Sequence, residues 1–468
     1  MRNRADDAAS RGVKSAAMRR LACTALLVVS AGVVARAQQP LTVVIPAGNV
    51  LLPNANSVPI GPNAGLEGSA YTARVGDPSA AWLNPAGLSR ALASELSGSS
   101  GLFQVSTLSP SDAPGSGGSV YRIPSMVGFM VTGARGGRLT VGLSIATVTS
   151  WSQDTDSELI ATSGGIADRF AFSADSRFDR FVGVGSAGYA TGKWRLGAGL
   201  AVVQTSLEKN AVGSNRASDG ATLRSLVFES RVRGSAFHLR PVFGVQYDAS
   251  PHFTAGVVAR TPAMKIYSSG SLTSEGVQTS GATSSGVSLF DPEAQFTAKL
   301  PFELRGGAAY IGRRLEVEVD VATEFGISTY DMLTSDQPVV MYASGSGAPS
   351  LTTRPFAGLV SQSETIVNVA VGGHLLLSDN GVWRLHFGAA TDRSGVGPED
   401  ELFTKIHLSV WTLGVSGTKN KLQFTAGVNY RSGSSGNITL GELQNGTLVR
   451  SGIGVRTIGI IYSVSYRF

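Results

Sequence analysis

Hydrophobic residues alternate with polar residues or glycine along much of this chain, in short stretches bounded by Gly, Asn, Asp, Ser or Pro. In the stretch 315–321, hydrophobic residues occupy the odd positions and three carboxylates occupy the even ones. A period of two places successive side chains on opposite sides of a β-strand. The pattern therefore predicts strands with one apolar face. No run of about 18 apolar residues after position 37 predicts a membrane-spanning helix.

Fourteen such stretches can be counted, and the links between them alternate in length. Links such as 191–192 and 312–313 are short, whereas 151–177 and 327–362 are long. Tight turns at one end and larger loops at the other are typical of a membrane barrel. The sequence therefore predicts an all-β fold, a 14-stranded antiparallel transmembrane β-barrel over 92–468. The expected strands are 92–107, 119–134, 138–150, 178–191, 193–206, 223–247, 251–268, 294–312, 313–326, 363–377, 380–391, 404–416, 420–432 and 452–468.

Residues 1–37 have the features of a secretory signal peptide. A basic leader precedes an apolar run at 21–34, and Ala35-Arg36-Ala37 follows as a small-residue cleavage site. The run is shorter than the roughly 20 residues that a membrane helix needs. A basic tail before a buried helix is the alternative, and Met18 is an alternative start to Met1. The chain is therefore expected to be exported.

Export changes the meaning of the charge. Residues 1–37 hold seven basic and two acidic residues of the chain's 39 and 33, which leaves 32 basic and 31 acidic residues in the remainder. The high isoelectric point therefore belongs to the leader and gives no support for nucleic-acid binding. The single cysteine, Cys23, lies in the apolar run, so the exported part has no disulfide.

The last strand has an apolar face that includes Tyr466 and the final residue, Phe468. A strand of this kind resembles the membrane-insertion signal of bacterial outer-membrane barrels. The resemblance implies a multi-pass barrel in a Gram-negative outer membrane, with membrane lipid and the barrel assembly machinery as partners. An edge strand of a soluble protein is the alternative, although an exposed apolar edge at a terminus invites aggregation.

Residues 38–91 are rich in Pro, Ala and Gly and are expected to form short helices and turns inside the barrel. Asn84-Pro85-Ala86 is their most specific element, because Asn caps a turn and Pro fixes φ. With the preceding Gly65-Leu66-Glu67-Gly68 and Asp77-Pro78-Ser79, it resembles the N-terminal hatch of FadL-type transporters of long-chain fatty acids and aromatic hydrocarbons. An ordinary helix start is the alternative for Asn-Pro.

The resemblance implies uptake of a hydrophobic small molecule by capture, hatch movement and release through the barrel wall. A gap in the wall needs a strand broken by Gly or Pro. The candidates are Pro124, Gly128 and Gly142, with ordinary glycines of a tapered barrel as the alternative. The same sequence motif also resembles PorV-type barrels, which serve protein secretion or surface attachment. A general porin is a third possibility.

Charged residues on the polar strand faces are candidates for the lumen: Glu316, Glu318 and Asp320, with Arg305 and Arg384 as partners on other strands. Such pairs either stabilise the barrel or contact the ligand. The five histidines (238, 252, 374, 386 and 407) lack metal-ligand spacing, and the glycine-serine stretches lack a hydrolase motif. No enzyme activity, cofactor or metal is therefore expected, and a monomer is expected.

Overall fold

The computed structural model describes residues 51–54, 58, 60–110, 117–134, 138–163, 166–218, 221–345, 347–378, 382–442 and 448–468. The expected signal peptide, with Cys23 and the alternative start at Met18, lies outside these residues. None of the helices in the described part of the chain is long and apolar enough to cross a membrane.

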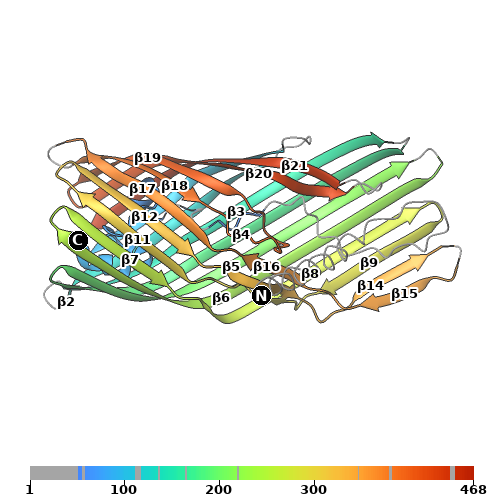
Figure 1. Cartoon of the computed structure of the whole chain (residues 1–468), viewed down its shortest axis with the longest axis horizontal. Helices are drawn as coiled ribbons and strands as arrows, with labels where there is room; N and C mark the ends of the chain where they lie inside the picture. The colour runs from blue at the N-terminus through green and yellow to red at the C-terminus, as the bar shows by residue number, and fades with distance from the viewer. Residues whose placement is uncertain are drawn as a thin grey trace, which may run out of the picture.

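Fourteen antiparallel strands form a closed barrel, because the last strand pairs with the first as well as with its predecessor (Figure 1). The predicted fold class is confirmed. In order round the ring, the strands are β1 (Glu95–Pro110), β2 (Gly117–Ala134), β3 (Leu139–Ser163), β4 (Ile166–Thr191), β5 (Trp194–Ser218), β6 (Leu223–Ser250), β7 (Phe253–Arg260), β11 (Glu303–Ile311), β12 (Leu315–Glu324), β17 (Ile366–Leu376), β18 (Trp383–Asp392), β19 (His407–Lys419), β20 (Leu422–Glu442) and β21 (Leu448–Arg467).

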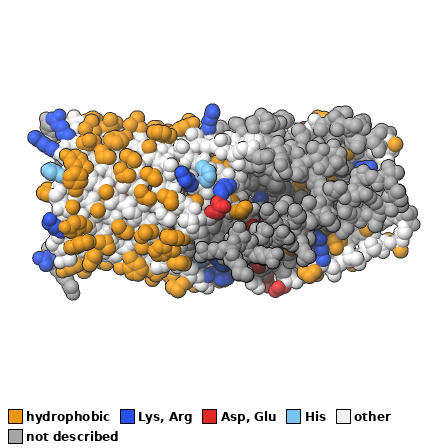
Figure 2. All heavy atoms as spheres, in the orientation of Figure 1, with side chains coloured by type: hydrophobic (Ala, Val, Ile, Leu, Met, Phe, Trp, Pro, Cys, Tyr) orange, Lys and Arg blue, Asp and Glu red, His pale blue; other side chains and the backbone are white. Residues whose placement is uncertain are grey.

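On the face of the barrel seen in Figure 2, the half that carries the short turns is apolar. On β12, Val319 and Val321 are 44% and 45% exposed, whereas Glu318 and Asp320 between them are buried. Aromatic pairs lie near the short turns, including Trp194 with Tyr247 at a ring distance of 4.5 Å. An apolar band bordered by aromatic residues is the surface of a barrel that spans an outer membrane.

Several strands extend well beyond this apolar half, into stretches expected to be loops. β3 and β4 pair continuously from Leu139↔Tyr189 to Ser163↔Ile166, apart from one bulge, so the expected loop 151–177 is a long hairpin. The expected loops 207–222 and 269–293 are also mostly strand, in β5, β6, β8 (Met264–Ser280) and β9 (Thr283–Asp291). The loop prediction is wrong because hydrogen-bonded ladders persist where the apolar alternation fades.

Proline interrupts two of the expected strands. The stretch 251–268 divides into β7 and β8 around Pro262, and 294–312 divides into β10 (Gln295–Phe296) and β11 after Pro301. Proline has no N–H to donate to a neighbouring strand, so a continuous central strand cannot pass through it. After Arg260, the chain leaves β7 and continues as β8, which among the described strands pairs with β6 and β9.

A second, smaller sheet packs against the inner surface of the outer half. It consists of β10, β13 (Ile327–Thr334) and β16 (Leu359–Ser363). The strands β14 (Val339–Ser344) and β15 (Ser350–Arg354) belong instead to the large sheet, which they extend beyond β9. Phe296 and Leu333 are fully buried in a core that also includes Leu51, Phe178 and Val232. An apolar core therefore occupies part of the outer half of the lumen.

Residues 60–91, here called the hatch, lie inside the barrel in the half with the short turns (Figure 1). They form η1 (Ala64–Leu66), α2 (Ala80–Leu83) and η2 (Pro85–Arg90). Leu66 contacts the backbone of β19 and β20, whereas Pro85 contacts β4 and β5 on the opposite side of the ring. A segment that touches strands on both sides of a closed ring lies within it.

Candidate functional site

Two carboxylates of β12 hold the backbone of the hatch. Asp320 accepts hydrogen bonds from the hydroxyl of Thr72 at 2.6 Å and from the backbone N–H of Tyr71 at 3.2 Å. Glu318 accepts a hydrogen bond from the backbone N–H of Ala73. Both carboxylates are buried. These two lumen candidates therefore contact the hatch, as their alternation along β12 requires.

Arg74 of the hatch is the guanidinium that pairs with these carboxylates. Its Nε lies 3.0 Å from Glu318, its Nη1 lies 3.7 Å from Glu316, and its Nη2 forms an ion pair with Glu67. The Arg74 side chain is 2% exposed. The sequence analysis did not single out Arg74, although it is a lone charge among the small and apolar residues of 70–76, and that contrast is a usable signal.

Glu67 lies at the centre of the polar contact. Its carboxylate also faces Nδ1 of His374 at 3.0 Å and Nδ1 of His386 at 2.7 Å. Burial alone would raise the pKa of the Glu67 carboxyl, but Arg74 and the two imidazoles outweigh burial and hold that pKa well below its usual range. Glu67 is therefore ionised inside the barrel.

The Asn84-Pro85-Ala86 turn meets the opposite side of the wall. The Asn84 side chain accepts a hydrogen bond from the backbone N–H of Ala86, and it donates to the carbonyls of Thr72, Val245 and Val257. The amide thus caps its own turn, as its sequence predicts, and also binds the hatch to β6 and β7.

Glycines of the wall make room for this turn. A Cβ added at Gly197 of β5 would come within 2.2 Å of the backbone of Pro85 and Ala86, and one at Gly244 of β6 would come within 2.0 Å of the Asn84 oxygen. Glycine is required at Gly197 because the two backbones approach each other directly, and at Gly244 because the Asn84 side chain fills the space of a Cβ.

The three proposed positions for a wall opening lie on β2 and β3. β1 and β2 have a register shift beside Pro124, while β2 and β3 pair without interruption from Met126 to Thr132. A Cβ at Gly128 would come within 3.1 Å of Pro78, and one at Gly142 within 2.8 Å of Leu88. The two glycines therefore lie where the hatch packs closely against the wall.

The remaining candidates are dispersed. Arg305 lies on β11 with its Nη1 3.5 Å from the carbonyl of Ser69, and Arg384 lies on β18 two positions before His386. Tyr466 and Phe468 are 42% and 58% exposed on the outer surface, where their rings stack. Their role in membrane insertion stays a prediction.

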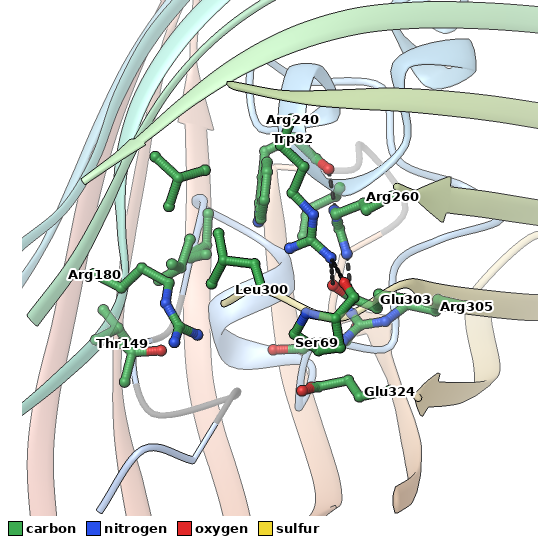
Figure 3. A pocket seen from close by; sticks show the side chains of 16 residues that line it. Ser69, Trp82, Thr149, Arg180, Arg240, Arg260, Leu300, Glu303, Arg305 and Glu324 are labelled. Atoms are coloured by element: carbon green, nitrogen blue, oxygen red, sulfur yellow. Dashed lines mark hydrogen bonds and ion pairs between the residues drawn. The ribbon is translucent and has the colours of Figure 1, made fainter. Parts of the chain in front are cut away.

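A cavity lies between the hatch and the segment that precedes β11, and Figure 3 shows its lining. Apolar side chains come from the hatch, from the wall and from the segment before β11. Arg180 of β4 points into the cavity from one side, and Arg240, Arg260, Arg305 and Glu303 gather on the other. The lining is Val58, Ile60, Ser69, Trp82, Leu83, Val148, Thr149, Arg180, Val203, Arg240, Arg260, Leu300, Pro301, Glu303, Arg305 and Glu324.

The charges on the far side of this cavity are mutually paired. Glu303 forms ion pairs with Arg260 and, at 3.8 Å, with Arg240, and the Arg260 guanidinium stacks over Trp82 at 4.2 Å. By contrast, the Arg180 guanidinium lies over the Phe178 ring at 5.4 Å, and its Nε has no hydrogen-bond partner among the described residues. Sequence reasoning missed Arg180, which lay in the weakly patterned start of an expected strand.

A second cavity adjoins the first, because both are lined by Arg180, Pro301 and Glu324. It extends to Phe325 and Ile366, at the level where β12 ends and β17 begins. Phe325 is 43% exposed on the outer surface. The two cavities together therefore reach from the hatch towards the side of the barrel.

Comparison with known proteins gives structural matches alone. No family model matches the chain, and no curated protein matches it. Among solved structures, the Pseudomonas putida toluene transporter TodX matches with a TM-score of 0.56 at 13% identity, covering 89% of this chain and 100% of TodX. This chain has a FadL-type fold.

Two further structures agree. A Pseudomonas aeruginosa FadL homologue matches with a TM-score of 0.55 at 13% identity, covering 90% of this chain and 99% of that one. The Ralstonia pickettii toluene transporter TbuX matches with a TM-score of 0.55 at 16% identity, covering 89% and 99%. The FadL-type fold is thus shared along almost the whole length of each protein, with little sequence in common.

Proposed function

We propose that this barrel takes up hydrophobic small molecules that carry an acidic group, with long-chain fatty acids as the leading class. The observation that carries the proposal is the cavity above the hatch, in which an apolar lining surrounds Arg180. A hydrocarbon tail gains roughly 0.8 kcal/mol for each CH₂ group that leaves water, so an apolar cavity suits the tail. The carboxylate needs a cation, and Arg180 supplies one.

The charge of the cavity favours an anion over a neutral hydrocarbon. Four guanidiniums face two carboxylates, Glu303 and Glu324. Glu303 is already paired with Arg260 and Arg240. The half-buried Arg180 guanidinium makes no hydrogen bond to a carboxylate among the described residues, and an incoming carboxylate would supply a charge-assisted one. The matched structures described as toluene transporters carry a neutral substrate, so this chain would differ from them in ligand class.

The route follows from the two joined cavities. A ligand would enter the second cavity, reach Arg180 where the two cavities meet, and leave after the hatch shifts. We place the side passage near Pro301, where the wall strands end, in preference to the earlier candidates on β2 and β3. Transfer through the side of the barrel keeps an apolar tail out of a water-filled pore, which is where it is least stable.

Uptake of oleate and of toluene into vesicles containing the purified barrel tests the proposal. The wild-type protein should speed oleate entry over protein-free vesicles. Arg180→Leu should reduce oleate entry at least about tenfold, because a hydrogen bond to a charged group contributes about 1.5–3 kcal/mol. Arg177→Leu is the matched control, because Arg177 lies on the same strand with its side chain 61% exposed.

Toluene entry should be unchanged by either substitution. Oleate entry that is no faster than in protein-free vesicles would refute the uptake function. Equal oleate entry by wild type and Arg180→Leu would refute the role of Arg180. Co-purification of a large secreted protein in place of transport would favour the secretion-barrel alternative.

A further inference from the structure

The hatch and the wall together form a cluster of three metal-ligating side chains. Glu67 of the hatch, His374 of β17 and His386 of β18 are all buried, and one ligand atom from each lies within 4.8 Å of the other two. We propose that this cluster binds a divalent transition-metal ion of the zinc type, which joins the hatch to the wall. The sequence analysis expected no metal because the histidines lack metal-ligand spacing, and spacing does not reveal a contact between Glu67 and His374, which lie 307 residues apart.

The three donor atoms already converge. Nδ1 of His374 and Nδ1 of His386 point at the same oxygen, Oε1 of Glu67, at 3.0 and 2.7 Å. Two imidazole nitrogens and one carboxylate oxygen form a known zinc donor set that leaves a fourth position for water. Zinc–ligand bonds of about 2.0–2.1 Å place tetrahedral donors roughly 3.3 Å apart. The two imidazole–carboxylate distances therefore lie within about 0.6 Å of this spacing, and all three donor atoms lie within 4.8 Å of one another.

Neighbouring groups orient the donors. The far nitrogen of His386, Nε2, lies 2.8 Å from the hydroxyl of Ser416, which turns Nδ1 towards Glu67. The far nitrogen of His374 lies 3.7 Å from Glu316, and the second oxygen of Glu67 is engaged by Arg74. Metal-bound imidazoles characteristically give their second nitrogen to a hydroxyl, carbonyl or carboxylate, and metal-bound carboxylates are hydrogen-bonded in turn.

The charge of the surroundings favours an added cation. Four carboxylates, those of Glu67, Glu316, Glu318 and Asp320, gather around Arg74 of the hatch, and Arg384 lies nearby on β18. The carboxylates of this group outnumber its guanidiniums, four to two. Buried negative charge is costly unless cations balance it. A divalent ion would supply that balance at the point where the three donors meet.

In the alternative, no metal ion is bound, and the Nδ1 atom of each histidine carries a proton that it donates to Glu67. The cluster would then be a hydrogen-bonded contact between the hatch and the wall. The two alternatives differ in a directly measurable quantity, the metal content of the protein. This metal-binding inference does not depend on the proposed uptake function, so either can fail alone.

The test uses full-length mature barrel in detergent, without a polyhistidine tag, stripped with a chelator and titrated with Zn²⁺ and with Co²⁺. The wild type should bind one ion per chain at micromolar concentration or below. Cobalt should give the visible absorption of a tetrahedral nitrogen–oxygen site. Metal should also raise the apparent melting temperature. Absence of stoichiometric binding by the wild type would overturn the proposal.

Variants locate the site. His374→Gln and His386→Gln should each weaken binding at least about a hundredfold, and His252→Gln should leave it unchanged, because His252 is an exposed turn residue. Ser416→Ala should weaken binding by roughly tenfold to a hundredfold, the usual effect of removing a group that orients a metal ligand. Unchanged binding in both histidine variants would also overturn the proposal. Strand content by circular dichroism verifies that each variant is folded.

Discussion

The two faces of the hatch meet the barrel wall through opposite kinds of contact. Towards β2–β7, hatch side chains such as Trp82, Leu83 and Leu88 join one hydrophobic cluster with wall residues such as Val184 and Val203. Towards β12 and β17–β20, the contact consists of buried charges and hydrogen bonds around Glu67 and Arg74, with further bonds from Thr412 and Gln423. Apolar burial thus predominates towards the first half of the barrel, where Asn84 and Arg90 add polar contacts, and buried charge pairing predominates towards the second half.

The two faces of the hatch therefore contribute differently to its docking and to its exact position. Burial of apolar surface is nondirectional, so it favours docking without specifying one exact position. Buried charge pairs tolerate little displacement, because each partner left alone costs several kcal/mol. The charged face should therefore fix the position of the hatch. Any movement of the hatch would begin there only if water or another cation replaced the lost partners.

Removal of Arg74 should have the largest effect. Arg74→Met leaves the Glu67 and Glu318 carboxylates buried without their guanidinium, which costs about 3–5 kcal/mol. The opening free energy of the hatch should fall by that amount. Hydrogen exchange of the peptides covering 60–91 measures it, while exchange of the wall strands should change little.

Arg90→Met provides the matched control for this prediction. Arg90 also lies in the hatch and pairs with Asp248, but the two side chains are 16% and 29% exposed. Water can therefore solvate the partner that remains, and the loss should be much smaller. Equal losses for the two substitutions would contradict the assignment of the positioning role to the buried charged face.

A methyl group at Gly197 should have the next largest effect and tests the other face. The added carbon would lie 2.2 Å from the backbone of Pro85 and Ala86, which cannot rotate away. Overpacking of this kind costs about 1–3 kcal/mol. Gly197→Ala should lift the hatch from β5, raise exchange in 60–91 and increase single-channel conductance in planar bilayers.

Gly183→Ala is the control for the methyl group itself. Gly183 lies on the neighbouring strand β4, and a Cβ there has no atom within 4 Å. Both substitutions replace a strand glycine by alanine, so any difference between them reports the contact with the hatch. Similar conductance of the two variants would show that the hatch does not press on Gly197.

The barrel could be predicted from the sequence because each wall strand carries its own evidence. Alternation at 315–321 alone separates the exposed valines of β12 from the buried Glu318 and Asp320. The same local pattern placed expected strands in all fourteen positions of the ring. The pattern failed where other features decide the strand ends. Backbone hydrogen bonds continue the strands through 151–177, where the alternation is weak. Pro262 and Pro301 interrupt apolar stretches that otherwise look continuous.

The candidate sites were only partly predictable, because they depend on contacts between distant segments. Glu318 and Asp320 could be assigned to the lumen from strand parity, and Asn84 to a capped turn from its neighbours. Nothing local indicates that Arg74 meets Glu318, or that Glu67 lies between His374 and His386. Those contacts arise because residues 60–91 lie inside the closed ring of strands. The pattern within a single strand does not show which distant strands lie across the ring from each other.

The smallest predicted effect concerns Asn84, a polar residue on the apolar face. Asn84→Ala removes the cap on Ala86 and the donations to Thr72, Val245 and Val257, which should cost about 1 kcal/mol of hatch stability. Asn84→Asp separates these two roles, because it keeps the accepting oxygen and loses the donor. If the cap dominates, residues 60–91 should exchange hydrogen more slowly in Asn84→Asp than in Asn84→Ala. If the bonds to the wall dominate, these residues should exchange faster in Asn84→Asp, because the new charge would face three carbonyl oxygens. In that case, the apolar face would also contribute a directional contact that helps to fix the position of the hatch.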